Sequence, residues 1–376
     1  MQFLENFSPE LTIASPGRIN FIGEHTDYNM GYVLPTAIGN TITFKLQKNG
    51  SETQCNIHSI GYDGFSLDLK NIAISKTEWE NYVLGVLNEI SKLTDKVKGF
   101  DCTIESNLPL GSGLSSSAAM ECGLAYGLNK LFDLGLSKIT IVELSQRAEH
   151  SYVGTQCGIM DQFASVMSKQ GNVILLDCQS LQYQHIPIDI NPYKIIMLNT
   201  KVSHNLASSE YNTRRKECEE GVVIMKKENP QINTLRDVTR KILEASKNQM
   251  STTVYNRCSF IIDENKRVHK MVAAFKKNDL KEVGALLYEA HEGIRDLYEV
   301  SCPQSDFLVE FAKDNAMVLG ARQTGGGFGG CTLNIVHETE VDNFRKTAEI
   351  AYKKEFDIDL EAFEVQPSGG TMVIQN

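Results

Sequence analysis

The sequence lacks the features that mark several classes of protein. Its nine cysteines include no C-x-x-C pair, so the usual spacing of a zinc site is missing. Acidic residues number 47 against 37 lysines and arginines, and this excess argues against a general nucleic-acid or membrane-surface binder. No apolar run approaches the length of a membrane span, and no repeat or low-complexity tract occurs. These absences favour a globular protein without nucleic-acid or membrane partners.

The cysteines and the first residues also bear on where the chain works. An odd, unpatterned set of cysteines in 376 residues predicts reduced thiols and a cytoplasmic location. The opening Met-Gln-Phe-Leu-Glu-Asn-Phe has no basic segment and no long apolar core, so we expect no secretory signal peptide. The length suits two or three domains, each large enough for its own core. Two prolines within 186–192 predict a boundary between domains at 1–190 and 191–376.

The most informative stretch, residues 107–119, is dense in glycine and serine. Gly111 and Gly113 let the backbone bend tightly and let a ligand approach closely. The serines at 115–117 can cap a helix, which the apolar pattern predicts over 117–132. Free backbone N–H groups at a helix start form an anion site, most often for phosphate. The alternative is an ordinary loop with a capping serine.

A second polar stretch lies between apolar segments near the start of the chain. Residues 11–14 predict a short strand, and Ser15-Pro16-Gly17-Arg18 predicts a turn after it. Four of the polar side chains nearby can hydrogen-bond the hydroxyls of a sugar-like ligand: Arg18, Glu24, His25 and Asp27. The alternative is a polar turn with a local ion pair.

Two further segments contain residues with a structural and a functional interpretation. Residues 78–93 predict an amphipathic helix with Trp79 and Tyr82 one turn apart, which are either core residues or a platform for a flat base. A helix predicted over 138–152 carries Glu149. Asp161 follows two glycines and is either a helix cap or an acid at a phosphate site.

A second glycine-rich loop occupies residues 320–330, and its glycines formally match G-x-G-x-x-G. The alternating residues 331–336 predict a strand after it, where a dinucleotide-binding loop requires a helix. This context excludes a Rossmann dehydrogenase. The absence of G-x-x-x-x-G-K-[ST] excludes a Walker-type kinase.

Taken together, these segments resemble the GHMP kinase superfamily and, within it, the galactokinase family. Residues 17–29 resemble the galactokinase signature, 109–119 the superfamily phosphate loop, and 325–330 its third motif. Shorter stretches at 158–163, 209–211 and 298–303 also resemble galactokinases, so the resemblance runs from about residue 8 to the end. It implies a two-domain α+β fold. The first domain would resemble the second domain of ribosomal protein S5, and the second would be ferredoxin-like.

The resemblance also implies an activity and the residues that perform it. The activity would be ATP-dependent phosphorylation of the anomeric C1 hydroxyl of galactose, which gives galactose 1-phosphate and ADP and begins galactose catabolism. Arg18 would lie beside the reacting hydroxyl and Asp161. Galactose would be bound by Glu24, His25, Asp27, Gly158 and Tyr211. An aspartate can accept the hydroxyl proton, and a neighbouring arginine would keep it ionised.

The co-substrate and a metal ion follow from the same resemblance. The phosphates of ATP would be cradled by Gly111, Ser112, Gly113, Leu114, Ser115, Ser116 and Ser117. Trp79 and Tyr82 match an aromatic pair near adenine, and Ser117 and Glu149 would hold Mg²⁺. One hydroxyl and one carboxylate suffice, because Mg²⁺ keeps several waters. We expect a monomer with two small-molecule substrates.

Two rival functions remain open at this point. Kinases for N-acetylgalactosamine or arabinose are close relatives, and the wall near the C2 substituent cannot be seen in a sequence. A non-catalytic sensor of galactose and ATP is the other rival. Such sensors have lost part of the Ser-Ser-Ser-Ala stretch, which is intact here at 115–118. Phe21 and Ser112 depart from the family's usual residues without changing the polarity of the site.

Overall fold

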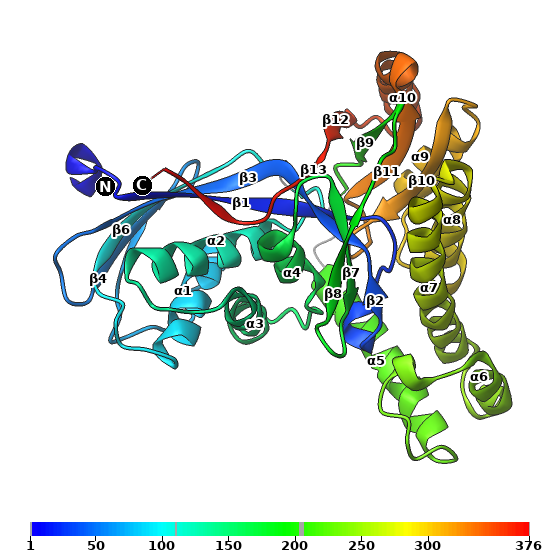
Figure 1. The fold of residues 1–376 in the computed structure, drawn as a ribbon, viewed down its shortest axis with the longest axis horizontal. Helices are drawn as coiled ribbons and strands as arrows, with labels where there is room; N and C mark the ends of the chain where they lie inside the picture. Colours follow the sequence, from blue (N-terminus) through cyan, green and yellow to red (C-terminus); the bar gives the residue numbers. More distant parts are fainter. Residues whose placement is uncertain (1, 110, 203–206, 376) are drawn as a thin grey trace.

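The computed structural model describes residues 2–109, 111–202 and 207–375, so Leu110 of the predicted phosphate loop lies outside it. The largest sheet has seven strands among these residues (Figure 1). Its path runs β14 (Met372–Gln375), β1 (Leu11–Asn20), β3 (Pro35–Lys48), β6 (Phe100–Ser106), β4 (Gln54–Ser59) and β5 (Phe65–Asp68), and β13 (Pro367–Ser368) pairs with β3. One face of this sheet is covered by α1 (Glu78–Ser91), α2 (Ser116–Leu131), α3 (Lys138–Ala148) and α4 (Met160–Met167).

Strand β1 corrects one expectation from the sequence. Residues 15–18 are not a turn: β1 continues to Asn20, and its pairing with β3 shifts register between Pro16 and Arg18. A Cβ on Gly17 would lie 2.7 Å from the carbonyl oxygen of Leu114, so only glycine lets the phosphate-loop segment approach this closely. The Pro16-Gly17 pair in the sequence therefore marks a β-bulge and not a chain reversal. The bulge redirects Arg18.

Several predicted elements are confirmed close to their limits. The helix predicted over 117–132 is α2, and residues 331–336 form the strand β11 (Cys331–His337). The helix predicted over 138–152 is α-helical only to Ala148 and continues as the π-helical turn η3 (Glu149–Val153). Such π turns frequently occur at functional sites.

The second sheet is antiparallel and has the order β10 (Val318–Thr324), β11, β9 (Tyr193–Asn199), β12 (Glu361–Val365). Two helices, α9 (Pro303–Lys313) and α10 (Val341–Phe356), complete a β-α-β-β-α-β order along the chain. This order and pairing are those of a ferredoxin-like domain, so the predicted α+β class is confirmed.

Four helices are inserted between β9 and α9: α5 (Ala207–Lys226), α6 (Arg240–Ser246), α7 (Thr252–Lys277) and α8 (Leu280–Gly293). Three of them, α5, α6 and α7, build the arm at the lower right of Figure 1. A second apolar cluster is buried among these helices and also includes Ile294, Tyr298 and Val300. Helix α8 packs against β10. The main apolar cluster extends from the first sheet into α7 and α8, so the two halves share a continuous core.

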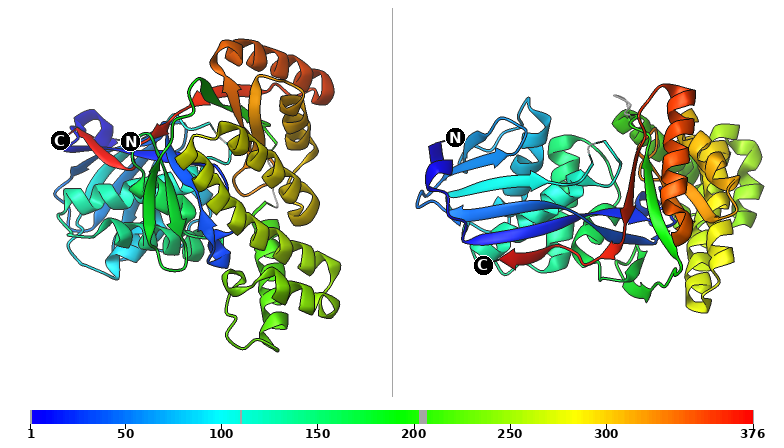
Figure 2. Two further views of the ribbon diagram at one scale, coloured as in Figure 1. Left: turned by 45° about the vertical axis from the view of Figure 1, so that its right-hand side comes forward. Right: turned by 90° about the horizontal axis from the view of Figure 1, so that it is seen from above.

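A small sheet of β2 (Tyr32–Val33), β7 (Asn172–Asp177) and β8 (Tyr183–Pro187) lies where the two halves meet. Beyond the second sheet, β13 and β14 return to the first sheet, which brings the end of the chain beside its beginning (Figure 2). The division at residue 190 stays a prediction. In the described part of the chain, no helix is long and apolar enough to cross a membrane.

We predict that Gly284→Ala in α8 destabilises the fold, although alanine favours helices by about 1 kcal/mol. A Cβ at this position would lie 1.9 Å from the carbonyl oxygen of Leu319 on β10. Separating α8 from β10 should lower the free energy of unfolding by about 1–3 kcal/mol, measured by urea denaturation. The control is Gly39→Ala in β3, where a Cβ would meet no atom within 4 Å. Equal stability of the two variants would contradict the prediction.

Candidate active site

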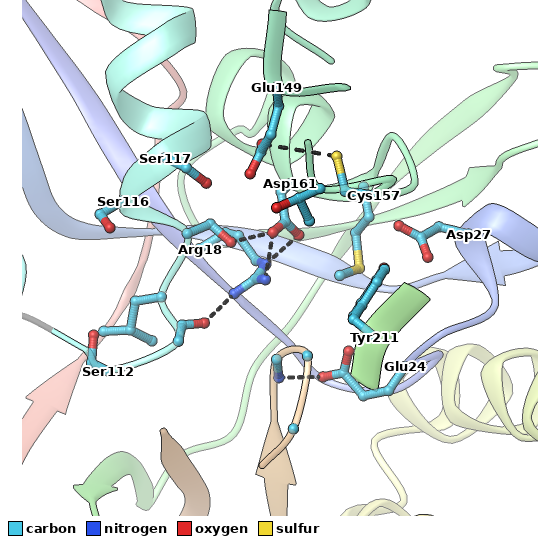
Figure 3. Close-up of a pocket in the computed structure, with 18 of the residues that line it drawn as sticks. Arg18, Glu24, Asp27, Ser112, Ser116, Ser117, Glu149, Cys157, Asp161 and Tyr211 are labelled. Carbon is cyan, nitrogen blue, oxygen red and sulfur yellow. Dashed lines mark hydrogen bonds and ion pairs between the residues drawn. The ribbon is translucent and has the colours of Figure 1, made fainter. Parts of the chain in front are cut away.

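A cavity of about 330 Å³ opens where the glycine-serine segment, the first polar segment and the second glycine-rich loop converge (Figure 3). Its wall contains these sequence-predicted residues: Arg18, Glu24, His25, Asp27, Tyr82, Gly111, Ser112, Gly113, Leu114, Ser115, Ser116, Ser117, Glu149, Asp161 and Tyr211. Two predicted residues, Trp79 and Gly158, are not part of this wall. Segments far apart in sequence are thus brought into one site.

The glycine-serine segment forms a concave stretch of backbone. Gly111, Gly113 and Ser115 all have φ between 60° and 70°, and α2 begins at the next residue, Ser116. The Ser112 hydroxyl donates to the carbonyl of Pro109 at 2.7 Å and fixes the turn from inside. Left-handed residues next to a helix start direct N–H groups and the positive end of the helix dipole towards one point. This geometry suits an anion such as a phosphate group.

Arg18 connects this segment to Asp161. Its Nε donates to Asp161 Oδ1 at 2.6 Å and its Nη2 to Oδ2 at 2.7 Å, which makes a bidentate ion pair. Its Nη1 donates to the carbonyl of Gly113 at 2.7 Å, and its main-chain N–H donates to Leu114 at 3.0 Å. Burial lowers the pKa of Arg18, but the charge and hydrogen bonds of Asp161 together raise it by more than burial lowers it. The net shift of the pKa is upwards.

Asp161 lies in the first turn of α4 and keeps part of its carboxylate exposed to the cavity. Ser115 donates a short hydrogen bond to its Oδ2, instead of capping α2 with its side chain. A carboxylate has about four acceptor positions. Arg18 and Ser115 take three of them, and among the described residues none takes the fourth, which is on Oδ1.

Glu24 is buried between the two halves of the molecule. Its Oε1 accepts from Arg322 Nη2 at 2.6 Å and from the Thr324 hydroxyl at 3.1 Å. It also accepts from the main-chain N–H of Gly325 at 2.9 Å (Figure 3). Burial raises the pKa of Glu24, but the positive charges of Arg322 and Arg18 lower it more, and the net shift is downwards. Glu24 is therefore an ionised acceptor at the edge of the cavity.

His25 belongs to an aromatic cluster on the same side. Its ring lies 4.8 Å from the ring of Tyr298 and 5.2 Å from that of Tyr211, and its Nδ1 is 2.9 Å from the Tyr28 hydroxyl. Its Nε2 is buried without a hydrogen-bond partner among the described residues. Burial lowers the pKa of His25 to about 4, so the ring is neutral at neutral pH. A neutral imidazole with one unused nitrogen can hydrogen-bond a hydroxyl.

Asp27 faces the cavity from the 3₁₀ turn η2 (Asp27–Asn29). Burial raises the pKa of Asp27 to about 7, and the negative charge of Asp161 adds to the shift. Gly158 lies directly against it, because a Cβ on Gly158 would be 2.0 Å from the carboxyl carbon of Asp27. Gly158 faces a neighbouring hollow on the other side of Asp27. Its predicted contact with a ligand is thus limited to its backbone.

Glu149 and Ser117 line the wall beside the start of α2. Gln162 donates to Glu149 Oε2 at 2.9 Å, and burial followed by the charge of Asp161 raises the pKa of Glu149 to about 7. Behind them the carboxyl group of Glu121, one helical turn after Ser117, is buried beside Glu149 and Gln162, and burial raises its pKa well above the ordinary value. Ser117 and Glu149 are thus the oxygen groups that the cavity itself exposes here. These oxygen donors fit a hard cation such as Mg²⁺.

The structure separates the two aromatic residues of α1. Tyr82 reaches the cavity, whereas Trp79 packs against Tyr62 and Phe65, with ring centroids 5.7 Å and 5.3 Å away. A role of Trp79 in holding a flat base stays a prediction. Its contacts show only that it belongs to an aromatic group one turn from Tyr82.

The sequence did not identify all the residues that build the site. Cys157 lines the cavity and donates its thiol to Glu149 at 3.8 Å, and the charged Arg322 lies on the buried strand β10. The sequence predicts a glycine-rich loop at 320–330 that includes Arg322, but the structure continues strand β10 to Thr324, and only the residues after it form the loop. That loop, Gly325 to Gly327, forms the wall opposite Asp161.

Family models match three segments of the chain: GHMP kinases N terminal domain at residues 81–169, Galactokinase galactose-binding signature at 1–48 and GHMP kinases C terminal at 271–354. A solved structure described as Lactococcus lactis galactokinase complexed with galactose superposes with a TM-score of 0.94 at 33% identity, covering 99% of this chain and 97% of that one. Methanococcus jannaschii mevalonate kinase shares the fold, with a TM-score of 0.67 at 18% identity over 96% of this chain and 99% of the other.

Curated relatives agree over nearly the whole length. The galactokinase of Thermosipho africanus is 40% identical and that of Thermotoga maritima 38%, each alignment covering 97% of this chain and all of the relative. The identity, the coverage and the cavity point to the same assignment. This chain belongs to the galactokinase family of the GHMP kinases.

Proposed function

We propose that this protein transfers the γ-phosphoryl group of ATP to the C1 hydroxyl of galactose, releasing galactose 1-phosphate and ADP. The observation that carries the proposal is the position of Asp161. It faces the cavity between the phosphate-loop segment and the polar segment with Glu24 and Asp27. A sugar held by the polar segment would present a hydroxyl to Asp161 beside a phosphate held by the loop.

Asp161 is the proposed proton acceptor. Its free position on Oδ1 would accept the proton of the C1 hydroxyl as that oxygen attacks the γ-phosphorus and the bond to ADP breaks. Arg18 holds the carboxylate by two hydrogen bonds. Its guanidinium is fixed in this orientation because the third nitrogen, Nη1, donates to the carbonyl of Gly113. Phosphoryl transfer depends mostly on such positioning and on charge stabilisation.

The sugar is assigned to the acceptors on the other side of the cavity. Glu24 and Asp27 would each accept hydrogen bonds from hydroxyls, and His25 and Tyr211 would complete the contacts on the cavity wall. Gly158 lies outside that wall, and its missing side chain would leave room for the carboxylate of Asp27. A site built to pair a hydroxyl discriminates against an analogue that lacks it or directs it elsewhere, since a buried polar group is then left unpaired. This reasoning supports selectivity for galactose over glucose.

The nucleotide is assigned to the loop, and its metal ion to Ser117 and Glu149. When bound, Mg²⁺ would neutralise negative charge on the phosphates. No cluster of three or more His, Cys, Asp or Glu in the described ranges can hold a metal by itself. We therefore infer that Ser117 and Glu149 supply two oxygen ligands and that the nucleotide and water supply the rest. Gly111 to Ser117 would cradle the phosphates, with Tyr82 near the base.

The test of this function is ADP release by the purified protein with ATP and Mg²⁺ on a panel of sugars. We expect kcat/KM for galactose to exceed that for glucose by about a hundredfold or more, with N-acetylgalactosamine and arabinose as further competitors. In Asp161→Asn, which keeps the shape and loses the proton acceptor, kcat for galactose should fall about a hundredfold or more, and KM should change less.

Three results would reject different parts of this proposal. Equal use of glucose and galactose would leave only a sugar kinase of the GHMP type. Near-normal kcat in Asp161→Asn would remove the role of Asp161 but leave the substrate assignment intact. Galactose binding without any turnover by the wild type would favour a sensor.

We predict that Glu149→Gln raises the Mg²⁺ concentration needed for half-maximal turnover, because a neutral amide is a weaker ligand than a carboxylate. Excess metal should restore part of the activity. A Mg²⁺ titration at saturating ATP and galactose measures the change. The control is Glu143→Gln, an acid on α3 that faces the neighbouring hollow and not the cavity. Identical titrations for both variants would make Glu149 a structural residue.

The raised pKa of Asp27 predicts that its carboxylate lowers the stability of the ligand-free protein while it strengthens sugar binding. In the unfolded chain this carboxyl has its ordinary pKa of 3.8, whereas in the folded protein its pKa is about 7. Between these two pH values the folded protein holds a proton that the unfolded chain has lost. The resulting stability is complete below about pH 4 and is lost as pH rises through about 7. Asp27→Asn removes this loss, so its Tm relative to the wild type should be higher at pH 8 than at pH 5.

The same variant should bind galactose less tightly, since the amide is a weaker acceptor of hydrogen bonds than the carboxylate. The KM for galactose at pH 8 is expected to rise, and the KM for ATP to stay nearly constant. A Tm difference that does not change with pH would show that Asp27 titrates normally.

A further inference from the structure

Arg322 is a completely buried arginine, and its hydrogen bonds within the described part of the chain go to the polar segment near the start of the chain, residues 17–29. Its Nε donates to the carbonyl of Phe21 at 2.8 Å, and its Nη2 donates to the carbonyl of Asn20 and to Glu24 Oε1, both at 2.6 Å. It does not line the cavity, so it does not touch a ligand there. Its strand, β10, belongs to the other half of the molecule.

The two oxygens of Glu24 have unequal surroundings. Oε1 accepts from three donors, on Arg322, Thr324 and Gly325. Within the described ranges no hydrogen bond reaches Oε2, while Glu24 is part of the cavity wall. The arrangement saturates one oxygen and leaves the other for a ligand. In Figure 3 the dashed line from Glu24 to the glycine-rich loop marks one of the three bonds.

We infer that Arg322 is a positioning residue, which holds Glu24 as an ionised carboxylate with Oε2 available to a sugar hydroxyl. The inference rests on the proposed function, which assigns Glu24 to the sugar. It goes further, since it makes sugar recognition by the polar segment depend on a residue of β10 about 300 positions later in the sequence.

The charges around Glu24 explain why one arginine matters. Arg322 faces it from β10 and Arg18 from β1, and its own segment supplies His25, which is neutral, and Asp27. Burial alone would raise the pKa of Glu24, and the charge of Arg322 is the largest of the influences that lower it. Without Arg322 the carboxyl would stay buried and lose its direct partner, so its pKa would rise.

The decisive variant is Arg322→Gln, which keeps polarity and much of the volume but removes the charge. Its control is Arg257→Gln. Arg257 is equally buried, pairs with Glu217 at 2.9 Å and Glu299 at 2.8 Å, donates to the Leu297 carbonyl, and has no part in the cavity. Both variants lose a buried arginine, and only one of these arginines contacts Glu24.

The measurement is the KM for galactose, with kcat and the KM for ATP, from about pH 6 to pH 9, a range above the ordinary pKa of a carboxyl group. Each variant is compared with the wild type at the same pH, which cancels the titration of Asp27. For Arg322→Gln we expect the KM ratio for galactose to be about tenfold or more at the acid end, the scale of a lost charge-assisted hydrogen bond. The ratio should shrink as pH rises, because Glu24 then regains its charge. The KM for ATP should not change.

Arg322→Lys provides a second test in case Arg322→Gln does not fold. The ammonium keeps the charge beside Glu24 but does not reproduce the planar fork whose Nε and Nη2 bond the two carbonyls, so thermal stability should fall. The KM ratio for galactose should stay close to one at every pH. A ratio for Arg322→Gln that is independent of pH, or that equals the ratio for Arg257→Gln, would overturn the inference. So would a pH-dependent ratio in Arg322→Lys. Absence of galactose turnover in the wild type would instead reject the proposed function.

Discussion

The bidentate pair between Arg18 and Asp161 is the contact on which the site depends. It joins β1 to the start of α4, and through the Gly113 carbonyl it also fixes the loop before α2. The same three segments also pack on one another, and Ser165 of α4 donates to the Pro16 carbonyl of β1 at 3.0 Å. The bulge in β1 and the missing side chain of Gly17 allow the approach, since any Cβ there would collide with the loop. The loop assigned to phosphate and the carboxylate of Asp161 are thereby held close together by one arginine.

The balance of charge around the cavity is unusual for a site proposed to bind phosphates. Glu24, Asp27, Glu149 and Asp161 all line it, and Arg18 is the one cation among the described residues of its wall. The pKa values of Asp27 and Glu149 rise to about 7, because burial and the charge of Asp161 both oppose ionisation. Such perturbed groups cluster at functional sites and cost stability in the ligand-free protein. A bound cation and hydrogen-bonding hydroxyls would offset that cost.

The two halves of the molecule each contribute an incomplete site. The first sheet and its helices supply Arg18, the glycine-serine loop, Glu149 and Asp161, and the second half supplies Tyr211 and the glycine-rich loop. Glu24 lies at the seam, with bonds to Arg322, Thr324 and Gly325 from the other half. Relative movement of the halves would therefore disturb the carboxylate assigned to the sugar, and the continuous apolar cluster across the seam opposes such movement.

The sequence by itself determined the local chemistry of this protein. Helix periodicity predicted α2, alternation predicted β11, and the composition of 17–29, 109–119 and 325–330 indicated the superfamily, since these segments carry their signal within a few residues. Only the tertiary structure decided the rest: that Gly17 marks a bulge and not a turn, that Trp79 lies off the cavity wall, and that Arg322 holds Glu24. The physical reason is the distance along the chain over which each interaction acts. Propensity and capping act between neighbours in the chain, whereas a buried charge takes the partner that the packing of two sheets brings to it, here about 300 residues away.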